Sequence, residues 1–376
     1  MSRIRVFYLT TGLLTGGAER ALLKLVRSID STRFESVIVS MLDLPPRVEL
    51  PSGVDLHSLG MRRGVPDPLA IPRLTRLLGR YRPDILQTWM YHADLLGLVA
   101  GKAHHRSKIL WNVRCADMDM RHYSTLSSMM PRTLAALSRF PDGIVINSRR
   151  GLQYHESLGY RPQRWHVVPN GFDTAEFRPE ALRRQATREA LGVGDNVVIG
   201  ILARVDPMKD HRTFLAAAAQ VADALPASRF VLAGMGASPD NRDLSRRIGE
   251  FGLRDRVSLL GKRDDVAQLL AGWDILVLSS IGEAFPNVIG EAMSCGVPCV
   301  VTDVGDNAEI VGDTGRVVPP RNPEALAGAI LELATLTPLA RQTLGTRARR
   351  RIEERYGLET VTRMYEEIYT GYAAHH

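Results

Sequence analysis

Two glutamates in the second half of the chain, Glu283 and Glu291, are separated by seven residues. If they belonged to one continuous helix, eight steps of about 1.5 Å would place them about 12 Å apart along its axis. A glycoside hydrolase needs its two carboxyl groups about 5–5.5 Å apart for retention, or about 6.5–9.5 Å apart for inversion. The spacing argues against hydrolysis and favours two carboxylates that accept hydrogen bonds from separate sets of sugar hydroxyl groups.

The segment between the glutamates also has the features of a helix start. Pro286 suits the first turn of a helix, because its missing N–H costs nothing there. The backbone N–H groups of Asn287 and Val288 would then point out of the helix. Together with the helix dipole they would form an anion site suited to a diphosphate.

Two basic residues, Arg204 and Lys209, follow an apolar run at residues 197–202. At a strand-to-helix junction, a planar guanidinium and a compact ammonium group are suited to neutralising a pyrophosphate. Taken alone, this spacing is better explained by two exposed cations, so its interpretation depends on the other motifs.

A glycine pair, Gly16 and Gly17, follows the first apolar run of the chain and precedes a helical pattern. Glycines let the backbone approach a ligand closely, and the helix that follows offers its N-terminus. The loop is not GxGxxG, so the fingerprint of a nicotinamide-binding site is absent here.

These motifs lie between short apolar runs that alternate with amphipathic stretches, a pattern that predicts parallel sheets covered by helices. A first series of strands is predicted at residues 3–10, 34–41, 54–59, 84–88, 109–113, 143–146 and 165–168. A second series is predicted at residues 197–202, 229–233, 257–260, 275–278 and 298–302.

The turn-forming residues 169–173 separate the two series and predict a domain boundary. We therefore expect an α/β protein with two Rossmann-like domains, residues 1–170 and 171–356, whose parallel sheets face a central cleft. Residues 357–376 are expected to form a last helix. Its apolar face can pack back on the first domain.

The net charge of +7 is unevenly distributed along the 376 residues. Residues 1–170 hold 24 Lys and Arg against 13 Asp and Glu, a net +11, whereas the remainder is net −4. Nucleic acid, an anionic membrane surface or an anionic small molecule could each explain a basic first half. No nucleic-acid-binding motif is recognisable, and a solvated basic surface without a partner also fits.

The three cysteines, Cys115, Cys295 and Cys299, include no CxxC pair and have no histidine cluster nearby. We interpret them as small buried hydrophobic residues of a protein from a reducing cytosol, rather than as a disulfide framework or zinc site. No apolar run approaches the ~18–20 residues needed to cross a bilayer.

Taken together, the motifs resemble the retaining glycosyltransferases of family 4, which have the GT-B fold. The resemblance covers nearly the whole chain. Its motifs are the glycine loop at residues 16–19, Asn147-Ser148, residues 168–173, the Arg204/Lys209 pair and the element from Glu283 to Glu291.

The resemblance implies a role for each motif. Glu283 would contact the donor sugar, Glu291 the ribose hydroxyls, and Arg204 and Lys209 the diphosphate, with the glycine loop against the phosphates. Similar enzymes also place a histidine near the sugar, at the position of His92. The predicted catalytic residues are therefore His92, Glu283, Arg204 and Lys209.

The predicted donor-binding set adds the glycine loop, the helix start and a loop that shapes the choice of base and sugar. This set is Gly16, Gly17, Arg204, Lys209, Lys262, Arg263, Phe285, Asn287, Val288 and Glu291. Ala284 stands where the family commonly has glycine, and it would be penalised if that position needs a positive φ.

No metal is expected. Asp117-Met118-Asp119 matches the DxD metal motif of another glycosyltransferase fold, but three-residue matches occur by chance. Residues 118–130 are read either as an acceptor-side or membrane-contacting loop or as a plain surface excursion.

The sequence thus predicts a metal-independent hexosyl- or N-acetylhexosaminyltransferase without a cofactor. A UDP-linked sugar would be its donor, and a saccharide or lipid-linked hydroxyl its acceptor, in cell-surface polysaccharide synthesis. We expect it in the cytoplasm, with peripheral binding to the inner membrane face and no nucleic-acid partner. The alternatives are a nucleotide-sugar epimerase with the same donor site and a binding subunit without turnover.

Overall fold

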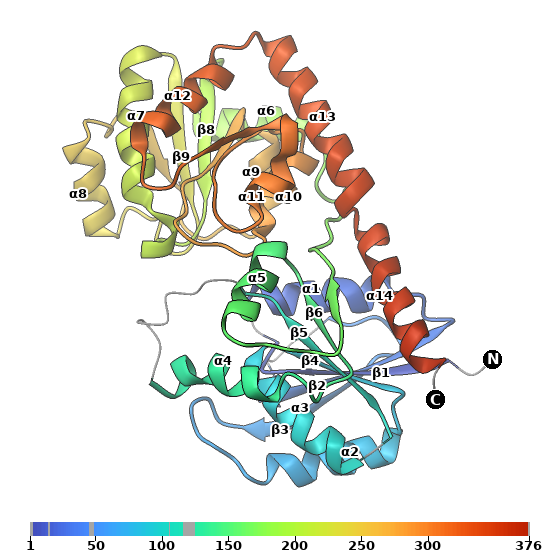
Figure 1. Cartoon of the computed structure of the whole chain (residues 1–376). Helices are drawn as coiled ribbons and strands as arrows, with labels where there is room; N and C mark the ends of the chain where they lie inside the picture. Colours follow the sequence, from blue (N-terminus) through green and yellow to red (C-terminus); the bar gives the residue numbers. More distant parts are fainter. Residues whose placement is uncertain (1–2, 14–15, 45–48, 105, 116–124, 375–376) are drawn as a thin grey trace. The chain divides into compact units, whose positions relative to one another are not determined.

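The chain folds into two compact units (Figure 1). The computed structural model describes residues 3–13, 16–44, 49–104, 106–115 and 125–374. The N-terminal unit comprises Met1–Gly171 and Leu358–His376, and the C-terminal unit comprises Phe172–Gly357. The domain limits predicted from the sequence, after residues 170 and 356, each lie one residue before the observed limits.

The N-terminal unit contains a seven-stranded parallel sheet in the order β3-β2-β1-β4-β5-β6-β7. Its strands are β1 (Ile4–Thr10), β2 (Phe34–Leu42), β3 (Asp55–Met61), β4 (Ile85–Trp89), β5 (Lys108–Val113), β6 (Gly143–Ile146) and β7 (Trp165–Val167). Its helices are α1 (Gly17–Ser28), α2 (Ala70–Tyr81), α3 (Tyr91–His104), α4 (Thr125–Leu137), α5 (Arg149–Ser157) and α14 (Leu358–Ala373).

The C-terminal unit contains a six-stranded parallel sheet in the order β10-β9-β8-β11-β12-β13. Its strands are β8 (Val197–Leu202), β9 (Ser228–Ala233), β10 (Val257–Leu259), β11 (Ile275–Leu278), β12 (Cys299–Thr302) and β13 (Arg316–Val318). Its helices are α6 (Ala181–Leu191), α7 (His211–Ala224), α8 (Arg242–Glu250), α9 (Val266–Ala271), α10 (Asn287–Ser294), α11 (Asn307–Val311), α12 (Pro323–Ala334) and α13 (Pro338–Tyr356).

Both sheets have the strand order of a doubly wound Rossmann fold, in which the order reverses beside the first strand. The predicted α/β class with two Rossmann-like domains is confirmed, whereas the cleft between them stays a prediction. No helix in the described ranges has both the length and the apolar character needed to cross a membrane.

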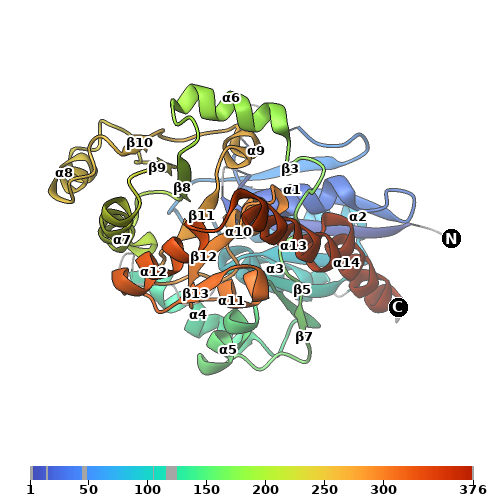
Figure 2. The same cartoon turned by 90° about the horizontal axis from the view of Figure 1, so that it is seen from above.

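The last helix, α14, completes the core of the N-terminal unit (Figure 2). Val361, Tyr365 and Tyr369 are buried in the cluster that contains side chains of β1 and α1. The Tyr369 hydroxyl donates to Gln87 Oε1 on β4 at 2.6 Å. The carboxylate of Glu366 accepts the N–H of Asp30 at 2.9 Å. The apolar face predicted for this helix is therefore the face that packs.

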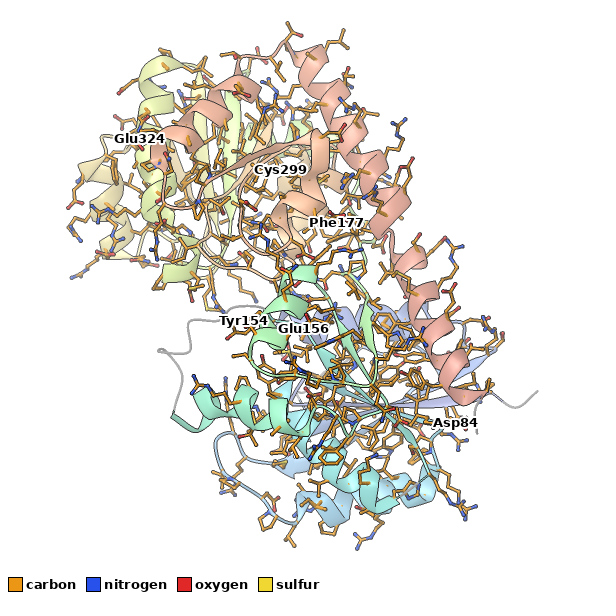
Figure 3. The ribbon with its side chains drawn as sticks, viewed as in Figure 1. Asp84, Tyr154, Glu156, Phe177, Cys299 and Glu324 are labelled. Carbon is orange, nitrogen blue, oxygen red and sulfur yellow. The ribbon has the colours of Figure 1, made fainter. Side chains whose placement is uncertain are left out.

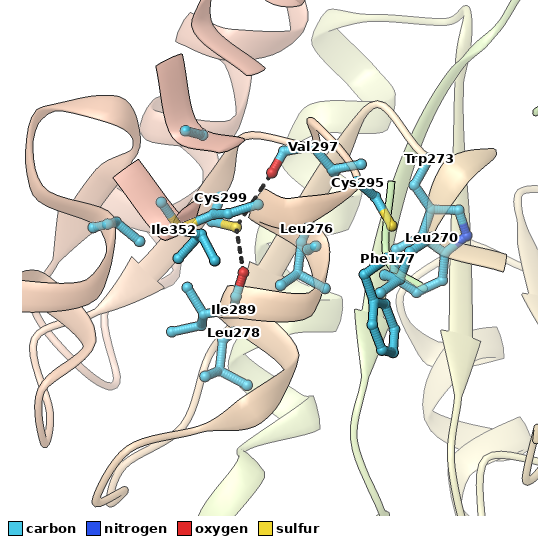
Figure 4. Close-up of a cluster of buried hydrophobic side chains, with 14 of the residues drawn as sticks. Phe177, Leu270, Trp273, Leu276, Leu278, Ile289, Cys295, Val297, Cys299 and Ile352 are labelled. Atoms are coloured by element: carbon cyan, nitrogen blue, oxygen red, sulfur yellow. Dashed lines mark hydrogen bonds between the residues drawn. The ribbon is translucent and has the colours of Figure 1, made fainter. Parts of the chain in front are cut away.

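The three cysteines are buried and free, as predicted. Burial raises the pKa of the Cys115 thiol and of the Cys295 thiol to about 12. In the core of the C-terminal unit, the Cys299 thiol donates weakly to the Val297 carbonyl at 3.5 Å and the Ile289 carbonyl at 3.9 Å (Figure 4). These thiols act as small hydrophobic groups.

A fully buried histidine, His155, lies on α5. Figure 3 labels its neighbours in sequence, Tyr154 and Glu156. Its Nδ1 lies 2.7 Å from the Gly151 carbonyl, and its Nε2 lies 2.8 Å from the Tyr91 hydroxyl. Since a carbonyl only accepts, Nδ1 carries a proton, and because burial lowers the pKa of His155 to about 4, the neutral ring accepts from Tyr91 at Nε2. The Tyr91 oxygen in turn accepts the Cys115 thiol at 3.1 Å. A neutral imidazole therefore satisfies both of its hydrogen bonds in this network.

The burial of His155 predicts that the N-terminal unit loses stability in mild acid. Desolvation lowers the pKa of His155 from 6.5 to about 4. In the unfolded chain, His155 takes up a proton as the pH falls through 6.5, whereas in the folded chain it does so only near pH 4. The free energy of unfolding therefore decreases as the pH falls from 6.5 to about 4. The full difference corresponds to about 3 kcal/mol. Urea unfolding at pH 7.5 and 5 should show a smaller acid effect in His155→Gln than in wild type. An equal effect would contradict this assignment.

Candidate functional site

The loops at the carboxyl end of the C-terminal sheet are joined by backbone hydrogen bonds. After β8 and β9, the N–H of Val205 donates to the Met235 carbonyl at 2.8 Å. After β11, the N–H of Ile281 donates to the Met208 carbonyl at 2.8 Å. Because ligands of open α/β sheets bind at the carboxyl ends of the strands, a ligand site is expected at this edge.

The backbone around Lys209 is fixed by polar side chains. Pro207–Lys209 forms a single 3₁₀ turn, capped by Asp206, whose carboxylate accepts the N–H of Met208 at 2.9 Å. Asp210 has a φ of 45° and caps α7 by accepting the N–H of Thr213 at 3.1 Å. The Ser279 hydroxyl at the end of β11 donates to the Lys209 carbonyl at 2.9 Å. The turn is thus tied to the neighbouring strand.

The structure brings together two predicted catalytic residues, Lys209 and Glu283. The Lys209 ammonium forms an ion pair with Oε1 of Glu283. The two side chains retain only 21% and 11% of their exposure, so the pair is largely removed from water. The Ser280 hydroxyl donates to the same Oε1 at 2.7 Å. Ser280 was not identified as a site residue from the sequence, because a serine between a strand and a loop has no distinctive pattern.

A glycine supports the backbone that carries Glu283. Gly305 has a φ of 52°, in the left-handed region, and a Cβ there would lie 2.5 Å from the Glu283 carbonyl oxygen. The N–H of Asp306 donates to the Ala284 carbonyl at 2.9 Å. Ala284 itself does not have a positive φ, so the penalty considered for an alanine at this position does not apply.

The helix predicted after Glu283 begins later than the sequence suggested. Pro286 is the N-cap residue of α10, with φ −73° and ψ 126°, so it stands just outside the first turn. Asn287 and Val288 are the first two helical residues, as an anion site at the helix start requires. Glu283 precedes the helix, so the continuous helix from Glu283 to Glu291 on which the estimate of about 12 Å depended is not present.

Two other members of the predicted donor-binding set are buried near this helix. Glu291 lies within α10 and is 8% exposed. The ring of Phe285 lies in the hydrophobic core, stacked on Phe172 with the ring centroids 6.3 Å apart. Phe285 thereby anchors the loop between Glu283 and α10.

The remaining predicted cations of the C-terminal unit each pair with an aspartate two residues further along the chain. Arg204 Nε lies 3.1 Å from Asp206 Oδ2, and Lys262 Nζ lies 3.4 Å from Asp264 Oδ1. Arg263 donates twice to Asp265, at 2.8 and 2.5 Å. These side chains are exposed, so such pairs contribute little to stability and leave the cations available to a ligand.

The predicted residues of the N-terminal unit follow two adjacent strands, β1 and β4. Gly16 is the N-cap residue of α1 and Gly17 its first residue. His92 is exposed near the start of α3, where partial desolvation by the surrounding chain lowers its pKa. Met90 has a φ of 74°, a conformation that costs free energy in a residue with a side chain.

Two earlier predictions fall wholly or mainly outside the described residues. These are the Asp117-Met118-Asp119 motif and most of the acceptor-side segment at residues 118–130. Within the described ranges, no three His, Cys, Asp or Glu side chains form a group that could hold a metal ion. The expected metal independence stays a prediction.

Comparison with known proteins agrees with this architecture. Residues 15–176 match the model described as Glycosyltransferase Family 4, and residues 196–335 match the model described as Glycosyl transferases group 1. The structure is similar to that of Anabaena Alr3699/HepE in complex with UDP, with a TM-score of 0.82 at 23% identity over 98% of this chain and 100% of that one. The fold is therefore that of the GT-B glycosyltransferases.

Relatives in sequence define the family more narrowly. The chain is 30% identical over 318 residues to the putative glycosyltransferase EpsF of Bacillus subtilis, covering 80% of each protein. It belongs to family 4 of the glycosyltransferases.

Other relatives match over a smaller share of their length. One is the N-acetyl-alpha-D-glucosaminyl L-malate synthase of Bacillus anthracis, 36% identical over 38% of this chain and 37% of that protein. Another is the UDP-Gal:alpha-D-GlcNAc-diphosphoundecaprenol alpha-1,3-galactosyltransferase of Escherichia coli, 32% identical over 39% of this chain and 38% of that protein. The chain thus spans less than half the length of these two relatives.

Proposed function

We propose that this glycosyltransferase moves a hexosyl or N-acetylhexosaminyl group from a UDP-linked sugar to a hydroxyl of a saccharide or lipid-linked acceptor, with retention of the anomeric configuration. The observation that carries the proposal is the Lys209–Glu283–Ser280 cluster at the carboxyl edge of the C-terminal sheet. The Lys209 ammonium group, which can bind phosphate oxygens, lies beside the Glu283 carboxylate, which can accept hydrogen bonds from sugar hydroxyl groups. A sugar diphosphate requires both kinds of group.

Each group of the site has a role in this proposal. Lys209, Arg204 and the N–H groups at the start of α10 stabilise the negative charge of the departing diphosphate. Glu283 and Glu291 accept hydrogen bonds from the donor sugar and the ribose. No side chain is assigned as a nucleophile, so the acceptor hydroxyl attacks on the face that the diphosphate leaves, and an oxygen of the departing diphosphate takes the proton of that hydroxyl. This cationic environment supports leaving-group stabilisation without a metal ion.

The acceptor in this proposal is an anionic, lipid-linked saccharide at the cytoplasmic face of the membrane, used in cell-surface polysaccharide synthesis. The excess of basic residues in residues 1–170 supports such a partner, because a cationic surface attracts both a diphosphate linkage and anionic lipids. The activity named for the Escherichia coli relative, on a diphosphoundecaprenol acceptor, is consistent with this choice.

The test is transfer from UDP-, GDP- and ADP-sugars to a short-chain polyprenyl-diphosphate saccharide, with and without EDTA. We expect one donor to be consumed, equally with EDTA, with the anomeric configuration of the product retained in its NMR spectrum. Arg204→Ala and Glu291→Gln should both lower the rate. Interconversion of donors without acceptor would identify an epimerase, and donor binding without turnover would identify a binding subunit. Loss of activity with EDTA would refute metal independence.

A further inference from the structure

The Lys209–Glu283 ion pair is more buried than the ion pairs of the other predicted cations of this unit. Other predicted cations of this unit, such as Arg204, keep their aspartate partners at the surface, where the Arg204 side chain is 59% exposed. The Lys209 and Glu283 side chains are 21% and 11% exposed. Because water screens this pair less, its attraction is stronger than that of the surface pairs.

Glu283 is held in place independently of Lys209. The Ser280 hydroxyl donates to Oε1 at 2.7 Å, and Ser280 is itself fully buried. The carbonyl of Ser280 accepts the Thr302 hydroxyl at 2.6 Å. Gly305 packs against the backbone of Glu283. The carboxylate therefore stays in position when its ion-pair partner leaves.

The backbone of Lys209 is fixed, but its side chain, unlike that of Glu283, can change its direction. Ser279 and the 3₁₀ turn hold its main chain, as described above. The ammonium group stands on a flexible four-carbon stem and has three donors. It can therefore turn from the Glu283 carboxylate to a phosphate oxygen without any movement of the backbone.

We propose that Glu283 is the internal counter-ion of Lys209 and competes with the diphosphate for its ammonium group. This inference rests on the proposed function, which places the diphosphate at Lys209. Binding of a nucleoside diphosphate must break the ion pair, so Glu283 weakens that binding. The same competition speeds release of the nucleoside diphosphate after transfer, since the carboxylate takes the ammonium back. Glu283 thus contributes to product release as well as to sugar binding.

The test is isothermal titration of UDP, GDP and ADP into wild type, Glu283→Gln, Lys209→Met and the double variant. The diphosphate that wild type binds should bind about tenfold more tightly to Glu283→Gln, as expected for loss of a coupling of about 1.4 kcal/mol. It should bind more weakly to Lys209→Met. In the Lys209→Met background, Glu283→Gln should change nothing, because no ammonium remains to be released.

A control separates this effect from a general change in charge. Glu332 lies in an exposed pair with Arg316 on the same unit, and Glu332→Gln makes the same change in net charge. It should leave the affinity unaltered. Equal or weaker binding by Glu283→Gln, with wild type still binding, would overturn the counter-ion role and leave the proposed donor site standing. If wild type binds none of the three diphosphates, the proposed donor site itself fails.

Discussion

Replacing Lys209 by methionine should lower kcat/KM for sugar transfer by about 10²–10³-fold. Removing one group that stabilises developing negative charge in a preorganised site has effects of this size. Methionine keeps the length and packing of the side chain but removes the charge. Glu283 then retains its hydrogen bond from Ser280. Initial rates of nucleoside diphosphate release, measured over a range of donor concentrations, give kcat and KM separately.

A matched control is Arg246→Ala on α8. Arg246 is an exposed cation of the same unit that pairs with Asp243 and Glu250 on its own helix. It should retain wild-type kcat and KM, since it lies on a solvated helix face. If Lys209→Met were as active as Arg246→Ala, Lys209 would have no part in stabilising the leaving group.

The second large effect concerns Gly345, in the middle of α13. A Cβ at this position would lie 1.9 Å from the carbonyl oxygen of Gly296, two residues after the end of α10. The obstructing atom is a backbone carbonyl oxygen, so it cannot move aside as the end of a flexible side chain would. Gly345→Ala should therefore destabilise the C-terminal unit by about 2–3 kcal/mol by forcing α13 away from α10. Thermal and urea unfolding both measure this change.

The neighbouring helix supplies the opposite case. Gly328 lies in the interior of α12, and a Cβ there meets nothing within 4 Å. Gly328→Ala should stabilise the protein by up to about 1 kcal/mol, because alanine has the higher helix propensity. Two glycine-to-alanine changes in helices of one unit thus have effects of opposite sign. A stabilising Gly345→Ala would show that the contact between α10 and α13 is loose.

Most strands were predictable because their residues are buried on both faces and form continuous apolar runs. β6, β8 and β11 have the bounds expected from the sequence. β13 was missed, since its three residues begin with a half-buried arginine and include an exposed valine. Only pairing with the edge of β12 makes this segment a strand.

The sequence indicated which residues belong to the site, but not which of them are in contact. Lys209 and Glu283 are 74 residues apart, and only the adjacency of β8 and β11 brings their loops together. The caps Asp206 and Asp210 carried a readable signal, an aspartate directly before a short helical segment. Ser280 carried none, because its role depends on a hydroxyl direction that spacing does not encode.

The return of α14 to the N-terminal unit has a consequence for the order in which the chain folds during its synthesis. The C-terminal unit is one continuous stretch, Phe172–Gly357, whereas the N-terminal unit also needs Leu358–His376. A ribosome therefore completes the second unit before it has made the segment that closes the core of the first. Until then, the surface that Val361, Tyr365 and Tyr369 will cover stays open. The first half of the nascent chain is thus the part that most needs protection from aggregation.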